Sequence, residues 1–240
     1  MSIKNTLLDF FLYLRNPKVP QSKKSEITIK SFFILFIFSM CVDYFLDMIC
    51  TNNWLINKLQ ITNIKSHNQK IYADGFWISF ILMVISAPLI EELSQRSYLK
   101  SFIWNNIFVP INIGLILIFT FQIRGYYLLA FCPIILVVSN MVYTRVLNYK
   151  KEKFHFLRSY INKYNLYFYL SAITFGTAHI RGYESAHFIP ILPILLVLPQ
   201  IFGGLLLGYI RVFMGLRWSI LFHALHNLFV LILLFINHKV

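Results

Sequence analysis

Three short groups of polar residues interrupt an otherwise apolar chain, and their residue types suit acid–base chemistry. The first group is the pair of adjacent carboxylates at Glu91 and Glu92, followed by Arg96. Glu92 and Arg96 are four residues apart, so on a helix they share a face and can form an ion pair. Glu91 projects about 100° away from Glu92 and is not neutralised by the same contact. Alternatively, the group is a charged helix end at the membrane surface.

Histidines and an amide provide the other two groups. Phe175 and His179 lie one helical turn apart with small residues between them, which favours close approach of another helix. A hydrogen-bonded packing histidine is the alternative for His179. His223 and Asn227 are also four apart and present an imidazole and an amide to one side of a helix. Together the groups offer one carboxylate, two imidazoles and one amide to a common desolvated site.

We expect the other polar residues in the apolar stretches to have structural roles. His226 lies off the face shared by His223 and Asn227, and we expect it to serve packing or a hydrogen bond between helices. Asp43 and Asp47 share a helix face, which favours structural pairing or a water-filled vestibule, because a charge inside a membrane persists when it pairs or faces a cavity. Gly204 and Gly208 form a small-xxx-small face typical of close helix packing.

The elements that carry these residues are predicted to be membrane-spanning helices. The chain has 240 residues, of which 58% are hydrophobic and only 13% charged. A soluble domain carries roughly 25% charged residues, so lipid must cover much of this surface. A span needs about 20 mostly apolar residues. We predict an all-α polytopic bundle of about seven spans, at 31–50, 76–99, 105–122, 126–144, 165–182, 188–210 and 218–236.

Charge predicts the orientation and the organisation of the chain. Residues 1–30 form a basic arm, in which Leu7, Leu8, Phe10, Phe11 and Leu14 suggest an interfacial helix; residues 31–240 form the membrane-embedded domain. Most Lys and Arg residues fall on the side of the N-terminus, which predicts a cytoplasmic N-terminus. The net charge of +13 therefore reflects membrane topology, and nucleic acid is not expected as a partner. The polar segment 51–75 is predicted to be a loop.

The order of the motifs resembles that of the CAAX protease and bacteriocin-processing family of intramembrane proteases, also called CPBP or Abi. The residues that carry the resemblance are Glu-Glu-x-x-x-Arg (91–96), Phe-x-x-x-His (175–179) and His-x-x-x-Asn (223–227). It covers the helices at 76–99 and 165–236. Between them, at about 105–144, lies an extra apolar hairpin that the family usually lacks at this place.

The resemblance implies an intramembrane endopeptidase of the glutamic type. Glu91 and His179 would activate a water molecule, and His223 and Asn227 would stabilise the oxyanion. Glu92, Arg96 and Phe175 would support these groups. No metal is favoured, although Glu91, His179 and His223 form the alternative set of zinc ligands. The expected substrate is a membrane-associated protein or peptide, either prenylated or a peptide precursor.

Two other functions remain open for the same residues. A proton-coupled transporter would use Glu91, Glu92, Asp43 and Asp47 as a relay. An immunity or scaffold protein would keep the fold without catalysis. The abundance of Lys, Asn and Ile suggests an AT-rich bacterial genome, so we expect a bacterial plasma membrane as the location.

Overall fold

The computed structural model describes residues 2–19, 28–50, 71–96, 99, 158, 160–179 and 196–238, and this part of the chain is helical without strands. The predicted all-α fold class is confirmed. The named elements are α1 (Ile3–Arg15), α2 (Ile29–Cys50), α5 (Phe76–Ser79), the π-helix η1 (Phe80–Ser86), α6 (Ala87–Arg96), α10 (Tyr164–Ala178), α12 (Leu198–Phe213) and α13 (Leu216–His238).

Three of the predicted spans coincide with helices that are long and apolar enough to cross a membrane. These helices cover Ile29–Leu46, Phe76–Arg96 and Leu216–Ile236, and α12 is a shorter apolar helix. The predicted spans at 165–182 and 188–210 overlap α10 and α12, although α12 continues to Phe213. The expected hairpin at 105–144 lies outside the described residues, as do residues 188–195.

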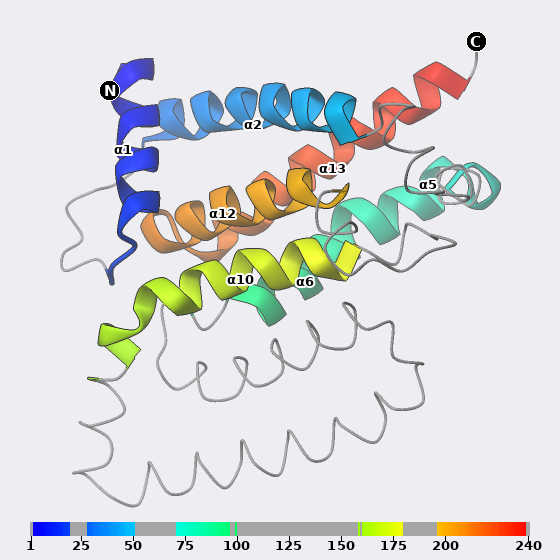
Figure 1. Ribbon diagram of the computed structural model, residues 1–240. Coiled ribbons are helices and arrows are strands. Elements are labelled where there is room, and N and C mark those ends of the chain that lie inside the picture. Colours follow the sequence, from blue (N-terminus) through cyan, green and yellow to red (C-terminus); the bar gives the residue numbers. More distant parts are fainter. Residues whose placement is uncertain are drawn as a thin grey trace, which may run out of the picture.

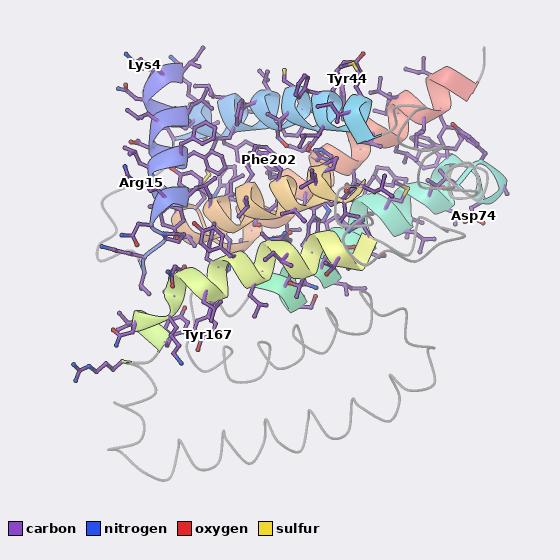
Figure 2. The ribbon with its side chains drawn as sticks, in the orientation of Figure 1. Lys4, Arg15, Tyr44, Asp74, Tyr167 and Phe202 are labelled. Atoms are coloured by element: carbon purple, nitrogen blue, oxygen red, sulfur yellow. The ribbon has the colours of Figure 1, made fainter. Side chains whose placement is uncertain are left out.

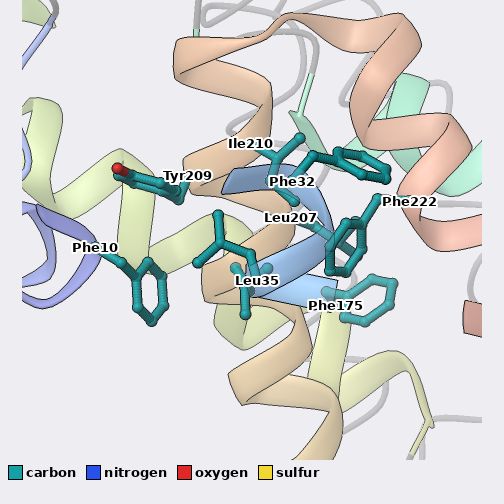
Figure 3. Packing of buried hydrophobic residues seen from close by; sticks show 9 residues of the cluster. Phe10, Phe32, Leu35, Phe175, Leu207, Tyr209, Ile210 and Phe222 are labelled. Carbon is teal, nitrogen blue, oxygen red and sulfur yellow. The ribbon is translucent and has the colours of Figure 1, made fainter. Parts of the chain in front are cut away.

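Helix α12 lies at the centre of the bundle. In Figure 1 it runs beside α10 on one side and α2 on the other, and α13 passes behind it. Helix α1 stands across the ends of α2 and α12. Figure 2 shows the dense side-chain packing between these helices, with Phe202 of α12 in the interior. Figure 3 shows an apolar cluster of the described residues, formed by Phe10, Phe32, Leu35, Phe175, Leu206, Leu207, Tyr209, Ile210 and Phe222.

Glycines allow α10 and α12 to approach closely, as the small-residue pattern predicted. A Cβ atom at Gly204 would lie 2.9 Å from the backbone of Ala172, and one at Gly208 would lie 2.9 Å from the ring of Phe168. These distances leave no room for a methyl group. The close approach brings the α10 residues that precede His179 against the core of the bundle.

The apolar residues of α1 lie in two environments, and the end of the predicted loop at 51–75 is helical. The apolar residues of α1 do not share one environment: Phe10 is buried in the core, whereas Leu8 and Phe11 are about half exposed, at 50% and 49%. Residues 71–74, predicted as loop, form a helical turn. The turn is stabilised because Ile71 packs against Val84 and Leu231, and its carbonyl accepts a hydrogen bond from Ser79.

Candidate active site

The carboxylate pair lies on a helix whose geometry changes just before it. Residues 80–86 form the π-helix η1, in which the Ala87 N–H bonds to the Leu82 carbonyl five residues earlier. Pro88 follows, and proline supplies no backbone N–H. Short π-helical stretches inside α-helices are frequent at functional sites. The wider π-helical turns therefore directly precede the helix that carries the carboxylates.

Glu92 is the buried anchor of the site. Its side chain is completely buried and forms an ion pair with Arg96, with a Nη1–Oε1 distance of 2.5 Å. The Ser219 hydroxyl donates a hydrogen bond to Oε2. The Nδ1 atom of His223 lies 3.2 Å from Oε1. The ion pair predicted from the spacing of Glu92 and Arg96 is therefore present, and Glu92 has polar partners on both carboxylate oxygens.

Glu91 lies next to this anchor in a different environment. Its side chain is 32% exposed, and its Oε2 atom lies 3.8 Å from Nε2 of His223, which is too long for a hydrogen bond. The same oxygen is buried and has no hydrogen-bond partner among the described residues. A carboxylate oxygen in this state can accept a proton or a hydrogen bond from a small polar molecule.

The contact with Glu92 determines how His223 carries its proton. A carboxylate paired with Arg96 is an acceptor, so the Nδ1 atom of His223 must be the donor. In the neutral imidazole Nε2 then carries a lone pair, and in the imidazolium it carries a hydrogen. In either state Nε2 is the atom that faces Glu91. His223 thus links a fully paired carboxylate to one that is not.

His179 lies at the C-terminal end of helix α10, and a backbone carbonyl determines its tautomer. Its Nδ1 atom lies 2.8 Å from the carbonyl of Phe175. A carbonyl only accepts, so Nδ1 donates and Nε2 of the neutral ring carries the lone pair. The Phe175 ring contacts both imidazoles, with centroid distances of 5.0 Å to His179 and 5.4 Å to His223. The Arg96 guanidinium carbon lies 4.4 Å from the centroid of the same ring.

Asn227 lies one turn beyond His223 on α13 but has a different partner. Its Nδ2 atom donates a hydrogen bond of 2.8 Å to the carbonyl of Met83 in η1. The shared face predicted for His223 and Asn227 is consistent with this arrangement, because both contact the helical segment that carries the carboxylates. His223 contacts its side chains, whereas Asn227 contacts its backbone.

The geometry does not assemble a metal site from the described residues. Within them, no three His, Cys, Asp or Glu side chains are grouped so that they could hold a metal ion. Glu91, His179 and His223, the alternative zinc ligands, therefore do not form such a group here.

Ser219 is a site residue that the sequence motifs did not predict. It is completely buried, donates to Glu92 and also contacts the Leu207 carbonyl of α12 at 3.1 Å. The signal was available, because Ser219, His223 and Asn227 are spaced by four residues and lie along one face of α13. A serine in an apolar helix is a weaker indicator of a functional site than a histidine. Its role depends on which neighbouring helix packs against that face.

The remaining intramembrane polar residues form a separate contact. Nε2 of His226 lies 2.8 Å from Oδ2 of Asp43, and Ser39 donates to the same oxygen at 3.2 Å. This contact joins α13 to α2. The hydrogen bond between helices expected for His226 and the pairing expected for Asp43 are confirmed; the side chain of Asp47 lies outside the described residues.

Comparison with known proteins points to one family. A family model described as type II CAAX prenyl endopeptidase, Rce1-like, matches residues 73–229. This range includes all three motifs and the described site. Neither the comparison with curated proteins nor the comparison with solved structures gives a match.

Proposed function

Because the chain belongs to the Rce1-like family of type II CAAX prenyl endopeptidases, we propose that it cleaves prenylated CAAX-type proteins in the membrane, with Glu91 as the base that activates water. Membership makes it a membrane protease of the CAAX type. The roles of individual residues and the prenylated substrate are our proposal. Transport and a purely structural role are not favoured.

The observation that carries the proposal is the contrast between the two carboxylates. Glu92 is held by Arg96, Ser219 and His223 and is already committed as an acceptor. Glu91 has a buried oxygen without a hydrogen-bond partner among the described residues, and the Nε2 atom of His223 faces that oxygen. A water molecule bound there could donate a hydrogen bond to Glu91. Withdrawal of its proton would generate the nucleophile, a step typically worth about 10²–10⁴-fold in rate.

The proposed reaction then proceeds through a tetrahedral intermediate. The activated water adds to the scissile carbonyl, the carbonyl oxygen becomes an oxyanion, and the proton taken up by Glu91 passes to the leaving amine. His223 can stabilise the oxyanion only when Nε2 carries a hydrogen. Because Nδ1 already donates to Glu92, that form is the imidazolium.

His179 and Asn227 complete the proposed machinery. His179 would assist Glu91 in activating water through the lone pair on Nε2, since Nδ1 donates to the Phe175 carbonyl. One Nδ2 hydrogen of Asn227 is used at Met83, so the second is the donor that the resemblance assigns to the oxyanion. An oxyanion donor is typically worth about 3–4 kcal/mol of transition-state stabilisation.

We propose a mechanism without metal, because each carboxylate and imidazole already has a role and the zinc alternative lacks a grouped set of ligands among the described residues. Purified protein should therefore retain cleavage after dialysis against a chelator. Near-stoichiometric zinc that is lost in His179→Ala would contradict this mechanism.

The function is tested with purified protein and in membranes. Wild-type protein and Glu91→Gln would be reconstituted with a farnesylated peptide that ends in a CAAX sequence, and the products identified by mass spectrometry. Asp74→Asn is a control, because it neutralises a carboxylate in the helical turn at 71–74, which Gly75 separates from the helix that carries Glu91. We expect cleavage by the wild type and the control only. In a second experiment, peptide termini are compared between membranes that contain the wild type and membranes that contain Glu91→Gln. Termini found only with the wild type would reveal substrates, including those that are not prenylated, whereas identical termini would contradict proteolysis.

A further inference from the structure

The carbonyl of Met83 lacks its ordinary backbone partner. In η1 the Ala87 N–H bonds to Leu82 five residues earlier, and the next bond of this pattern would join the nitrogen of residue 88 to the Met83 carbonyl. Residue 88 is proline, which has no N–H. In the hydrocarbon core of a bilayer, bulk water does not satisfy an orphaned carbonyl, so another polar group must do so. The side-chain amide of Asn227 occupies this position, with Nδ2 at 2.8 Å from the oxygen.

We propose that Asn227 is a positioning residue, whose amide replaces the backbone hydrogen bond that Pro88 cannot make and thereby fixes the direction in which Glu91 and Glu92 project. The inference rests on the proposed function of Glu91. Asn227 would act on the carboxylates through the Met83 carbonyl and the helix that leads from it to α6.

The contacts of α13 support this assignment. Two residues of α13, one turn apart, bind the helical segment on both sides of Pro88. Asn227 holds the Met83 carbonyl before the proline, and His223 meets Glu91 and Glu92 after it. The intervening π-helical turns are the part of this segment whose hydrogen bonding departs from an ordinary α-helix. With both ends held, the distance between Glu91 and His223 is defined.

The alternative is that removing Asn227 acts only through loss of an oxyanion donor, and a rescue experiment separates the two roles. Asn227→Ala leaves the Met83 carbonyl without a donor. Pro88→Ala restores a backbone N–H at residue 88, which can bond back along the helix without any side chain. The double variant therefore lacks the amide but regains a backbone donor in this turn, whereas it regains no donor for an oxyanion.

Cleavage of the farnesylated CAAX peptide would be measured for each variant. We expect Asn227→Ala to lower kcat about 100-fold with little change in KM, because small misplacements of catalytic groups have effects of this size. In the double variant Asn227→Ala/Pro88→Ala, kcat should be at least ten-fold higher than in Asn227→Ala alone. Pro199→Ala is the matched control: Pro199 is at the start of α12, where a missing N–H breaks no intrahelical bond, so it should give no recovery.

Thermal unfolding in detergent provides a second measurement that does not require cleavage. Asn227→Ala should lower Tm, and Pro88→Ala should restore part of the loss in the double variant; Pro88→Ser restores the same N–H if the alanine variant does not fold. The positioning role would be overturned if the Tm losses of Asn227→Ala and Pro88→Ala add in the double variant. It would also be overturned if the kcat of the double variant is as low as that of Asn227→Ala. Activity retained by Glu91→Gln would instead refute the proposed function and leave the Tm result unaffected.

Discussion

Glu91 and Glu92 are adjacent in the chain, yet only Glu92 is fully paired. Glu92 is completely buried against Arg96, Ser219 and His223, whereas Glu91 is partly exposed and has a buried oxygen without a partner among the described residues. Successive residues on a helix point about 100° apart. One carboxylate can therefore anchor the bundle while its neighbour remains available to react.

The first prediction concerns Glu91. Glu91→Gln should lower kcat by about 10²–10⁴-fold, the usual worth of a general base. It should leave the unfolding temperature unchanged, because the Oε2 atom of Glu91 accepts no hydrogen bond from the described residues. Peptide cleavage and thermal unfolding in detergent check the two parts. A large loss of stability would show that Glu91 has a structural role instead.

The second prediction concerns the buried ion pair. Arg96→Met leaves the Glu92 carboxylate buried without its cation, so the free energy of unfolding should fall by about 3–5 kcal/mol. The double variant Glu92→Gln/Arg96→Met should be more stable than Arg96→Met alone, because it removes the orphaned charge. Chemical denaturation of the purified protein measures both. If the double variant loses as much stability as Glu92→Gln and Arg96→Met lose separately in sum, the two residues are not coupled in this way.

The third prediction concerns Ser219. Ser219→Ala removes a buried donor to Glu92 and should cost about 1–3 kcal/mol of stability. It should also lower kcat, because Glu92 orients His223. Thr174→Val is the control: Thr174 is equally buried, but its hydroxyl bonds only to carbonyls of its own helix. Equal effects of the two substitutions would argue against a role for Ser219 in the site.

The fourth prediction compares two adjacent glycines of α12. A Cβ atom at Gly204 would meet Ala172 at 2.9 Å, whereas one at Gly203 would meet nothing within 4 Å. Gly204→Ala should therefore force α10 and α12 apart and cost about 1–3 kcal/mol. Gly203→Ala should be neutral or stabilising by up to about 1 kcal/mol, because alanine favours the helix. Unfolding temperatures of both variants provide the comparison, and similar shifts would contradict this packing.

The fifth prediction separates His226 from His223. His226→Gln should lose a hydrogen bond between helices, worth about 0.6 kcal/mol on average in a membrane, and should retain cleavage. His223→Gln should lose cleavage, because it cannot form the imidazolium that we propose. Asp43→Asn tests the same contact from α2, and its effect on stability should not add to that of His226→Gln. Loss of cleavage in His226→Gln would place that residue in the site.

Local spacing was sufficient for several features of the site. The pairing of Glu92 with Arg96 and the turn that joins Phe175 to His179 follow from the 3.6-residue helical period. The apolar runs predicted three of the membrane-spanning helices. These features involve residues within one helix or one stretch of chain, for which geometry is nearly independent of the rest of the molecule.

Contacts between distant helices could not be predicted in the same way. Sequence spacing places Asn227 on the face of His223, but it does not reveal that the partner is the carbonyl of Met83. Nor does it show that Ser219 meets Glu92, or that the face of α1 divides between Phe10 in the core and Phe11 outside it. These outcomes depend on which helices pack together and at what rotation.

The sequence was therefore enough for the family, the helical class and the residues available for chemistry, because those depend on residue type and local period. The tertiary structure was needed to distinguish Glu91 from Glu92, since two neighbouring carboxylates of identical chemistry differ only in what surrounds them. Arg96 reaches Glu92 along its own helix, but Ser219 and His223 reach it from α13. Packing of α13 against α6 thus assigns one carboxylate to structure and leaves the other for reaction.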